Sequence, residues 1–454
     1  MYRNTGQYLV LIINSHMQSP DAHSHSHNNH HQPPLPTMAS YSDSDVSMSS
    51  SLSATSSNRW RHEPFETFQV KALALAQELF SGLGVVGVEH IRGGANNRVV
   101  GININGQRKF ILRVPREPDC ADIPGDAACF IFVQWNARIQ CPKVVTFSTE
   151  EDNAIGSPFV VHSHVQGDSL CPSWWQKVGP GANEKKLKVA HQMGLAVRKM
   201  LETRNDSPGF PAFTAGRTRP GDPVLIESFC LTSAAPFMGR SLAGDREWQP
   251  TTGRPAITVA TFMSGVYQAH KRELAKESPM TDRTVQCIDA LTGLQTMVSH
   301  MATLEVFVQV GYSLYHHDIA PRNVMADWTS EEVTLTILDW DDVCFMPSFM
   351  AASPQPWLWE KSLNSVDSFE DDLRQRKEVF EAAAGPEYAR YARLQQVYDF
   401  ARDMMHFVLE RTVHNTETLA KARNLLLRWD AFVQKHGLAE QIAARAAELA
   451  ARSQ

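Results

Sequence analysis

The sequence lacks any apolar run that approaches the roughly 20 residues needed to cross a bilayer, so we expect no membrane partner. It also lacks a C-x-x-C pair, and its 7 cysteines are scattered and odd in number. Such cysteines indicate reduced thiols in a cytoplasmic protein rather than a disulfide framework or a zinc site. Basic residues are not in excess, because the formal net charge is -6, which argues against a nucleic-acid partner. There is no internal repeat, and no obligate protein partner is evident.

The chain is long enough for two lobes and a tail, since 454 residues exceed one ordinary domain. An apolar share of 43% and a charged share of 20% are typical of a soluble globular protein. Residues 1–57 differ from the rest, because they are rich in His, Asn, Pro and Ser. Such a segment buries too little apolar surface to offset its ordering entropy, so it predicts a disordered tail.

A helix followed by a β-hairpin is predicted where order begins. The helix is indicated by an apolar stripe that comprises Phe68, Ala72, Leu75 and Leu79. Further along, apolar and polar residues alternate on both sides of Asn105-Gly106, which is the strongest short hairpin signal. We therefore expect strands near 97–104 and 107–114.

Most of the chain after residue 169 has helical periodicity. Apolar stripes typical of core helices are formed by Leu187, Ala190, Gly194, Val197 and Leu201, by Val285, Ile288, Leu291 and Leu294, and by Val397, Ala401, Met404 and Val408. Residues 205–256 are rich in Gly, Pro, Ser and Thr and show weak periodicity. This composition predicts a long irregular insertion.

The functional hypothesis depends on three polar residues between positions 311 and 347. Asp318 and Asn323 lie in H-H-D-I-A-P-R-N, and the predicted strand V-T-L-T-I-L leads to Asp339 in D-W-D. Amide and carboxylate oxygens, such as those of Asn323 and Asp339, suit Mg²⁺ held against a phosphoryl donor. Asp318 offers a separate carboxylate that can orient a hydroxyl group and accept its proton. Each residue alone is equally typical of a turn or a helix cap, but their order and separation favour the layout of kinases.

These motifs resemble those of the aminoglycoside phosphotransferase family, kinase-like enzymes that often contain H-x-D-x-x-P-x-N and later I-x-D-W/F-D/E. The corresponding stretches here are HHDIAPRN and ILDWDD. The resemblance implies an α+β, bilobal protein-kinase-like fold, with a small N-terminal lobe that contains a β-sheet and a larger, mainly helical C-terminal lobe. On this basis we expect a nucleotide-binding lobe over residues 58–165 and a catalytic and substrate-binding lobe over residues 166–454.

The resemblance also assigns phosphate-binding residues in the N-terminal lobe. It matches GGANNRVV to a G-G-x-x-N-x-V-Y loop, so Gly93, Gly94 and Asn97 are expected near the phosphates. A plain turn is the alternative interpretation of the two glycines. The resemblance matches ILRVP to the strand whose basic residue pairs with the phosphates, here Arg113 where protein kinases have Lys. Arg can hold a phosphate through two hydrogen bonds, so the change is compatible with binding.

Two further assignments concern the helix after that strand and the connection between the lobes. On the helix, Asp126 takes the place of the Glu that pairs with the basic residue in protein kinases, and it is equally typical of a helix N-terminus. The segment VVHSHVQGDSL resembles the connection whose main chain contacts a nucleobase, which points to Ser163 and Val165. We interpret His162 and His164 as linker residues rather than ligands.

The favoured hypothesis is an ATP-dependent phosphotransferase, with GTP as the alternative donor, that acts on a hydroxyl group of a small molecule. In this hypothesis Asp318 is the catalytic base, Asn323 and Asp339 hold Mg²⁺, and Arg113 neutralises charge on the donor. Supporting roles are expected for His316, Arg322 and Asp341.

Two alternatives stay open. The first is a kinase-like nucleotide-binding module with little or no catalysis, which the altered residues Arg113 and Asp126 motivate. The second is a protein-kinase-like enzyme that acts on a protein hydroxyl. The sequence has no G-x-G-x-x-G loop and no A-P-E segment after D-W-D, which disfavours the second alternative.

Overall fold

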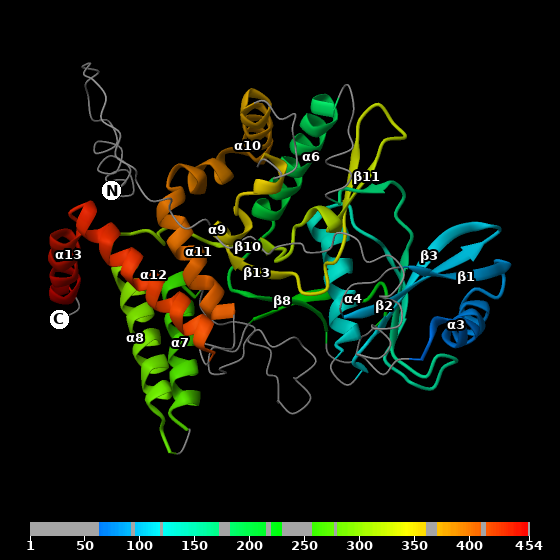
Figure 1. Cartoon of the computed structure of the whole chain (residues 1–454), viewed down its shortest axis with the longest axis horizontal. Helices are drawn as coiled ribbons and strands as arrows, with labels where there is room; N and C mark the ends of the chain where they lie inside the picture. Colours follow the sequence, from blue (N-terminus) through cyan, green and yellow to red (C-terminus); the bar gives the residue numbers. More distant parts are fainter. Residues whose placement is uncertain are drawn as a thin grey trace, which may run out of the picture.

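The computed structural model describes residues 63–91, 96–118, 121–171, 182–214, 219–228, 257–276, 279–359, 370–409 and 415–452. The tail predicted over residues 1–57 lies outside the described residues. The described chain forms two lobes (Figure 1). A β-sheet with a helix packed on it forms the N-terminal lobe, and helices form most of the C-terminal lobe. This arrangement confirms the α+β, bilobal fold class, while the boundary between residues 165 and 166 stays a prediction.

The N-terminal lobe is built on one antiparallel sheet with the strand order β1-β2-β3-β5-β4. Its strands are β1 (Val85–Ile91), β2 (Asn97–Ile104), β3 (Gln107–Pro115), β4 (Val144–Ser148) and β5 (Phe159–Ser163). β2 and β3 are the predicted hairpin, in which Ile104 pairs with Gln107. Asn105 and Gly106 have φ values of 50° and 75°, as a two-residue turn of this kind requires.

The helix α3 (Phe65–Leu79) covers one face of this sheet (Figure 1). The predicted stripe is the packed face: Phe68, Ala72 and Leu75 are buried, and Leu79 is half-buried. Each large apolar side chain that leaves water contributes about 1.5–3 kcal/mol. Packing on the sheet therefore holds this helix in place.

A second helix of this region, α4 (Ile123–Phe132), continues into a π-helical turn, Val133–Ala137, and contacts both lobes. Its N-terminus is capped by Asp122, whose side chain accepts a hydrogen bond from the Gly125 amide at 3.1 Å. The Phe132 ring packs edge-on against Phe345 of the C-terminal lobe, with ring centroids 5.6 Å apart. The helix thus links the sheet to the catalytic lobe.

The described helices of the C-terminal lobe are α6 (Ala182–Glu202), α7 (Val259–Leu274), α8 (Asp282–Thr303), α9 (Ser348–Ala351), α10 (Glu370–Arg393), α11 (Gln395–Leu409), α12 (Thr416–Lys435) and α13 (Leu438–Arg452). A sheet of order β7-β10-β13-β8-β9 contains β7 (Arg204–Asn205), β8 (Gly209–Phe213), β9 (Val224–Ser228), β10 (Tyr312–Tyr315) and β13 (Cys344–Pro347). A smaller sheet of order β12-β11-β6 contains β6 (Asp168–Ser169), β11 (Val324–Asp327) and β12 (Thr334–Ile337).

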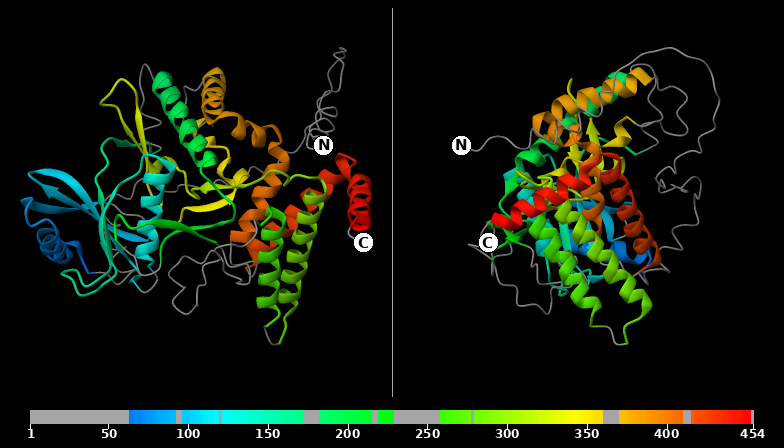
Figure 2. Two further views of the ribbon diagram at one scale, coloured as in Figure 1. Left: turned by 180° about the vertical axis from the view of Figure 1, so that it is seen from behind. Right: turned by 90° about the vertical axis from the view of Figure 1, so that its left-hand side faces the viewer.

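The helices pack in two groups around these strands. α6 packs along α10, and α7 and α8 run side by side with α12 across them, as Figure 2 shows from behind and from the side. Of the predicted core stripes, the one from Val397 to Val408 is fully buried, whereas Val285 on α8 is exposed. No described helix is long and apolar enough to cross a membrane.

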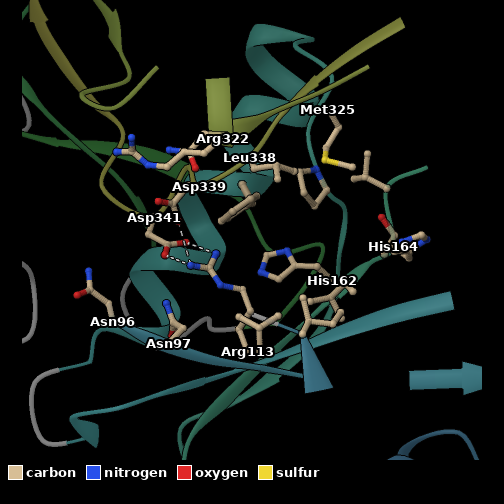
Figure 3. A pocket seen from close by; sticks show the side chains of 18 of the residues that line it. Asn96, Asn97, Arg113, His162, His164, Arg322, Met325, Leu338, Asp339 and Asp341 are labelled. Atoms are coloured by element: carbon tan, nitrogen blue, oxygen red, sulfur yellow. Dashed lines mark hydrogen bonds and ion pairs between the residues drawn. The ribbon is translucent and has the colours of Figure 1, made fainter. Parts of the chain in front are cut away.

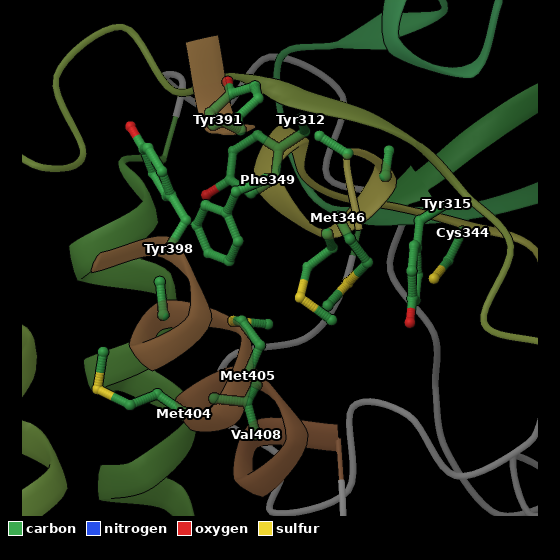
Figure 4. Close-up of a cluster of buried hydrophobic side chains, with 14 of the residues drawn as sticks. Tyr312, Tyr315, Cys344, Met346, Phe349, Tyr391, Tyr398, Met404, Met405 and Val408 are labelled. Carbon is green, nitrogen blue, oxygen red and sulfur yellow. The ribbon is translucent and has the colours of Figure 1, made fainter. Parts of the chain in front are cut away.

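A buried aromatic and methionine cluster lies beside β10 and β13 (Figure 4). The Phe349 ring stacks against Tyr398, with ring centroids 5.7 Å apart, and Met404 and Val408 of α11 complete this side of the core. Because β10 ends at Tyr315, directly before the H-H-D motif, the cluster anchors one end of the candidate catalytic loop.

The interpretation of residues 205–256 as a long irregular insertion is wrong for their first half. β8 and β9 lie within this range and pair with each other and with β13. The order comes from long-range pairing rather than from a local pattern, since β8 has Pro211 in its middle and shows no apolar alternation. Residues 229–256 lie outside the described residues.

Candidate active site between the lobes

A cavity of about 780 Å³ lies between the two lobes. The N-terminal lobe lines it with residues of β2, β3, α4 and β5, and the C-terminal lobe lines it with residues from 317–325 and 338–342. Figure 3 shows side chains of both lobes around this space. Asp318, Asn323 and Asp339, which are far from the N-terminal lobe in sequence, all line the cavity beside it.

His316 fixes the shape of the candidate catalytic loop. Its Nδ1 accepts a hydrogen bond from the Asp318 amide at 3.1 Å, so the proton resides on Nε2, which donates to the Leu338 carbonyl at 2.9 Å. Burial lowers the pKa of His316 to about 4, so the ring is neutral at pH 7 and keeps this tautomer. Trp340 packs edge-on against the ring at 4.6 Å. The imidazole thereby ties the loop of Asp318 to the strand end that precedes Asp339.

Asp318 is held by residues that follow it in the same loop. Asn323 Nδ2 donates to Asp318 Oδ2 at 2.8 Å and to the Asp318 carbonyl at 3.0 Å. Arg322 Nη2 lies 2.8 Å from each carboxylate oxygen. A turn of 3-10 helix at Pro321–Asn323 brings these side chains back to Asp318. The carboxylate is thus fixed in orientation, and 30% of the side chain stays exposed, so a hydroxyl group can reach it.

Asn323 and Asp339 fit Mg²⁺ by their chemistry. Asn323 contacts Asp318 through its side-chain NH₂ group. This contact does not use the side-chain oxygen, Oδ1, which can therefore bind a cation. The Asp339 side chain is 46% exposed and lines the same cavity. Among the described residues, no group of three or more His, Cys, Asp or Glu side chains could hold a metal by itself. The protein therefore offers part of an oxygen shell, which the phosphates of a nucleotide and water would complete.

Arg113 joins the two lobes through ion pairs with the D-W-D segment (Figure 3). Its Nη1 donates to Asp341 Oδ1 at 2.8 Å, and its Nη2 donates to Asp341 Oδ2 and to Asp339 Oδ1, the latter at 3.1 Å. Burial opposes the charge of the guanidinium, but the carboxylates of Asp341 and Asp339 outweigh it and raise the pKa of Arg113 above its ordinary value. The carboxylates that accept hydrogen bonds from Arg113 are thus those of Asp341 and Asp339. Asp126, which we expected to pair with Arg113, acts on it by charge attraction, and its side chain is one methylene shorter than the Glu of kinases.

The connection between the lobes borders another part of the cavity. The Ser163 amide donates to the Lys143 carbonyl at 2.8 Å, and the Ser163 hydroxyl accepts from the Lys143 amide at 2.9 Å. Val165 also lines the cavity, and within the described part of the chain its main chain makes no hydrogen bond. A main-chain amide and carbonyl in this position are suited to bind a nucleobase.

The predicted phosphate loop is described only near its end. Gly93 and Gly94 lie outside the described residues, so their assignment stays a prediction. Asn97 is the first residue of β2 and lines the cavity together with Asn96 (Figure 3). The Asn96 carbonyl accepts a hydrogen bond from the Arg116 amide at 2.8 Å, which extends the hairpin toward the cavity.

His162 is a cavity residue that we interpreted as part of a linker. It is 3% exposed, its ring lies 4.4 Å from that of Phe130, and its Nδ1 is buried without a hydrogen-bond partner among the described residues. Burial and the charge of Arg113 lower the pKa of His162 well below its ordinary value, so the ring is neutral. The alternation of side chains along β5 was the signal that could have placed His162 in the cavity. Val161 belongs to the core under α3, so the side chain of its neighbour His162 faces the opposite side of the sheet.

Comparison with known proteins gives distant relatives. No family model matches the chain. The protein of Zygosaccharomyces rouxii named "Altered inheritance of mitochondria protein 9, mitochondrial" is 22% identical over 317 residues, which are 60% of this chain and 50% of that protein. The protein of the same name from Lachancea thermotolerans is 26% identical over 345 residues, 66% of this chain and 54% of that protein. The chain thus spans about half the length of the curated relatives it matches.

Solved structures with a similar fold include aminoglycoside phosphotransferases. A GDP complex of an aminoglycoside 2'-phosphotransferase-IIIa variant has 13% identity and a TM-score of 0.42, and covers 80% of this chain and 98% of its own. A ternary complex of an aminoglycoside phosphotransferase with streptomycin and ATP has 12% identity and a TM-score of 0.41, and covers 78% and 94%. These values mark a remote likeness, so the functional proposal depends on the side chains of this chain.

The expected cytoplasmic location is wrong by this comparison, because the relatives matched in sequence are named as mitochondrial proteins. The expectation came from scattered, odd-numbered cysteines, which indicate a reducing environment. Reduced thiols do not distinguish one reducing compartment from another, so the cysteines alone were insufficient evidence for the cytoplasm.

Proposed function

We propose that this chain is an ATP-dependent phosphotransferase that transfers a γ-phosphate to a hydroxyl group of a small molecule. The observation that carries the proposal is the position of Asp318, Asn323 and Asp339 along one cavity between the lobes, with Arg113 in hydrogen-bond contact with Asp339. A base, an oxygen-rich cation site and a fixed positive charge are the three parts that phosphoryl transfer needs. Catalysis by such a site is mostly positioning and electrostatic stabilisation.

Each residue has a separate task in this proposal. Asp318 orients the acceptor hydroxyl and accepts its proton. Asn323 and Asp339 would hold Mg²⁺, which neutralises charge on the donor phosphates when it is bound. Arg113 adds positive charge beside the same carboxylates. The main chain around Ser163 and Val165 binds the base of the donor, with ATP as the favoured donor and GTP as the alternative.

We also propose that the protein resides in mitochondria. The support is the printed name of the relatives matched in sequence. Since the chain spans about half their length, any further role of those proteins is a separate proposal. Fractionation of cells that produce the tagged protein tests the location, and recovery in the cytosolic fraction alone would contradict it.

The activity is tested with purified protein, Mg²⁺, ATP and a panel of metabolites that carry hydroxyl groups. The variant Asp318→Asn keeps the size of the base but not its charge, and we expect turnover to fall by about 10²–10⁴-fold. Asp430→Asn is the matched control, because Asp430 is exposed on α12 and lies outside the cavity. Its turnover should equal that of the wild type.

Three results would contradict the proposal. Equal turnover by the wild type and Asp318→Asn would show that Asp318 is not the catalytic base. Tight binding of Mg²⁺ and ATP without transfer to any acceptor or to water would favour the nucleotide-binding module instead. A phosphorylated protein in place of a phosphorylated metabolite would favour the protein-kinase-like alternative.

A further inference from the structure

Arg322 donates hydrogen bonds to both carboxylate oxygens of the proposed base, Asp318. Its Nη2 is 2.8 Å from both carboxylate oxygens of Asp318, and Asn323 Nδ2 donates to Oδ2 at 2.8 Å. Both oxygens of the carboxylate therefore accept hydrogen bonds already. Oδ1 accepts from Arg322 alone, whereas Oδ2 accepts from both Arg322 and Asn323. Loss of the Arg322 hydrogen bonds would therefore leave Oδ1 without a donor in the described structure and make it a stronger acceptor for the proton of a hydroxyl group.

Arg322 is the donor that can move away. Asn323 is bound to both the carboxylate and the carbonyl of Asp318, and its own carbonyl accepts from the Leu338 amide at 2.7 Å. The Arg322 side chain is 66% exposed, and Asp318 is the acceptor of the hydrogen bonds that it makes in the described structure. An ion pair with so exposed an arginine is weak because water screens its charges, so an anion in the cavity can compete with the carboxylate.

The other arginines of the cavity have partners that are not the base. Arg113 is paired with Asp341, and Arg108 is paired with Glu89 at 2.6 Å. Arg322 differs from them, because its partner is the proposed base. Its release would leave the Asp318 carboxylate, which must accept a proton, with fewer hydrogen bonds. Its planar guanidinium also matches the geometry of a phosphate or a carboxylate.

We propose that Arg322 binds an anionic group of the acceptor, a phosphate or a carboxylate close to the reacting hydroxyl, and that this exchange frees Asp318. The inference rests on the proposed function and names its substrate class: hydroxyl compounds that carry a negative charge. The hydroxyl proton then passes to the freed oxygen of Asp318 while the acceptor oxygen bonds to the γ-phosphorus. The bond from the γ-phosphorus to the bridging oxygen breaks, and its electron pair leaves with the nucleoside diphosphate.

The test compares small acceptors that differ in charge, with Mg²⁺ and ATP held constant. Glycerol 3-phosphate and glycerate are the anionic probes, glycerol is the neutral probe, and ethanolamine is the cationic probe. For the wild type we expect kcat/KM at least about 10-fold higher on an anionic probe than on glycerol or ethanolamine, as one lost charged contact of about 1.4 kcal/mol predicts. In Arg322→Gln this preference should disappear through a higher KM for the anionic probes, and Arg322→Lys should restore part of it.

A second measurement applies even if none of these probes is phosphorylated, because it uses water as the acceptor. Sulfate, added at constant ionic strength, should raise ATP hydrolysis by the wild type severalfold and leave Arg322→Gln unchanged. Without sulfate, Arg322→Gln should hydrolyse ATP at least as fast as the wild type, since its base is already free. Arg452→Gln is the matched control, because Arg452 has 67% exposure and a similar i,i+4 ion pair, with Glu448, on α13.

Several results would overturn the inference. Equal loss on all probes in Arg322→Gln would mean that the arginine only positions the loop. A raised KM for ATP would mean that Arg322 binds the donor phosphate, and a preference for ethanolamine would point to Asp342, an exposed carboxylate of the cavity. If no variant binds or hydrolyses ATP, the proposed function itself fails, which is a different result.

Discussion

At the scale of single residues, Asp339 reaches the cavity from a left-handed backbone conformation, with φ of 61°. For a residue other than Gly this conformation costs roughly 1–2 kcal/mol, although Asp tolerates it better than most. The residues on both sides of Asp339 are held in place: the indole of buried Trp340 donates to the Ile337 carbonyl at 2.8 Å, and the Leu338 amide donates to the Asn323 carbonyl at 2.7 Å. Strain of this kind is retained where a side chain must face a ligand.

The protonation of His316 predicts a dependence of stability on pH. Its pKa is about 4 in the folded protein and about 6.5 when unfolded, so the unfolded state binds more protons between these values. The free energy of unfolding should therefore fall as the pH drops from 6.5 toward 4, by about 2 kcal/mol between pH 7 and pH 5. Urea denaturation at the two pH values measures this difference.

The variant His316→Asn should lose this part of the pH dependence, because the titrating ring is gone. Part of the dependence will remain, since the pKa of buried His162 is also lowered. The matched control is His191→Asn, because His191 is exposed on α6. A pH dependence of His316→Asn as steep as that of the wild type would show that folding does not lower the pKa of His316.

At the scale of elements, the packing of α6 on α10 depends on Gly194. A Cβ atom at this position would lie 2.5 Å from the Phe380 carbonyl oxygen and 2.7 Å from the Ala383 Cβ. We expect Gly194→Ala to lower the free energy of unfolding by about 1–3 kcal/mol, although Ala favours helix by about 1 kcal/mol relative to Gly. The control is Gly82→Ala, since a Cβ there meets nothing within 4 Å. Equal stability of the two variants would mean that the helices can separate at no cost.

Elements with a strong local signal were predictable from the sequence, and those held by distant pairing were not. The Asn105-Gly106 turn fixed the β2–β3 hairpin because both residues tolerate positive φ. β8 and β9 have no comparable pattern, since their order comes from pairing with β13. A local pattern reports the conformation of a few residues, whereas a strand partner can lie anywhere in the chain.

The same difference applies to the candidate site. Asp318, Asn323 and Asp339 could be identified because their spacing along the chain reflects one local loop and strand. The contact between Arg113 and Asp341 joins residues 228 positions apart, so the local pattern pointed instead to Asp126 on the nearby helix. The burial of His162 likewise depends on how the helix α4 and the sheet meet, which no local pattern records.

At the scale of the whole molecule, the cavity is lined by both lobes, so a bound nucleotide should hold them together. A ligand that binds only the folded state at 100 times its Kd adds about 2.7 kcal/mol to stability. We expect ATP with Mg²⁺ to raise the Tm, and ATP with a chelator to raise it much less, because in the proposed site Asn323 and Asp339 would hold phosphates only through the cation. Asp339→Asn should weaken the Mg²⁺-dependent part, whereas Asp430→Asn on α12 should preserve it. A shift that is the same with and without Mg²⁺ would place the phosphates away from Asp339.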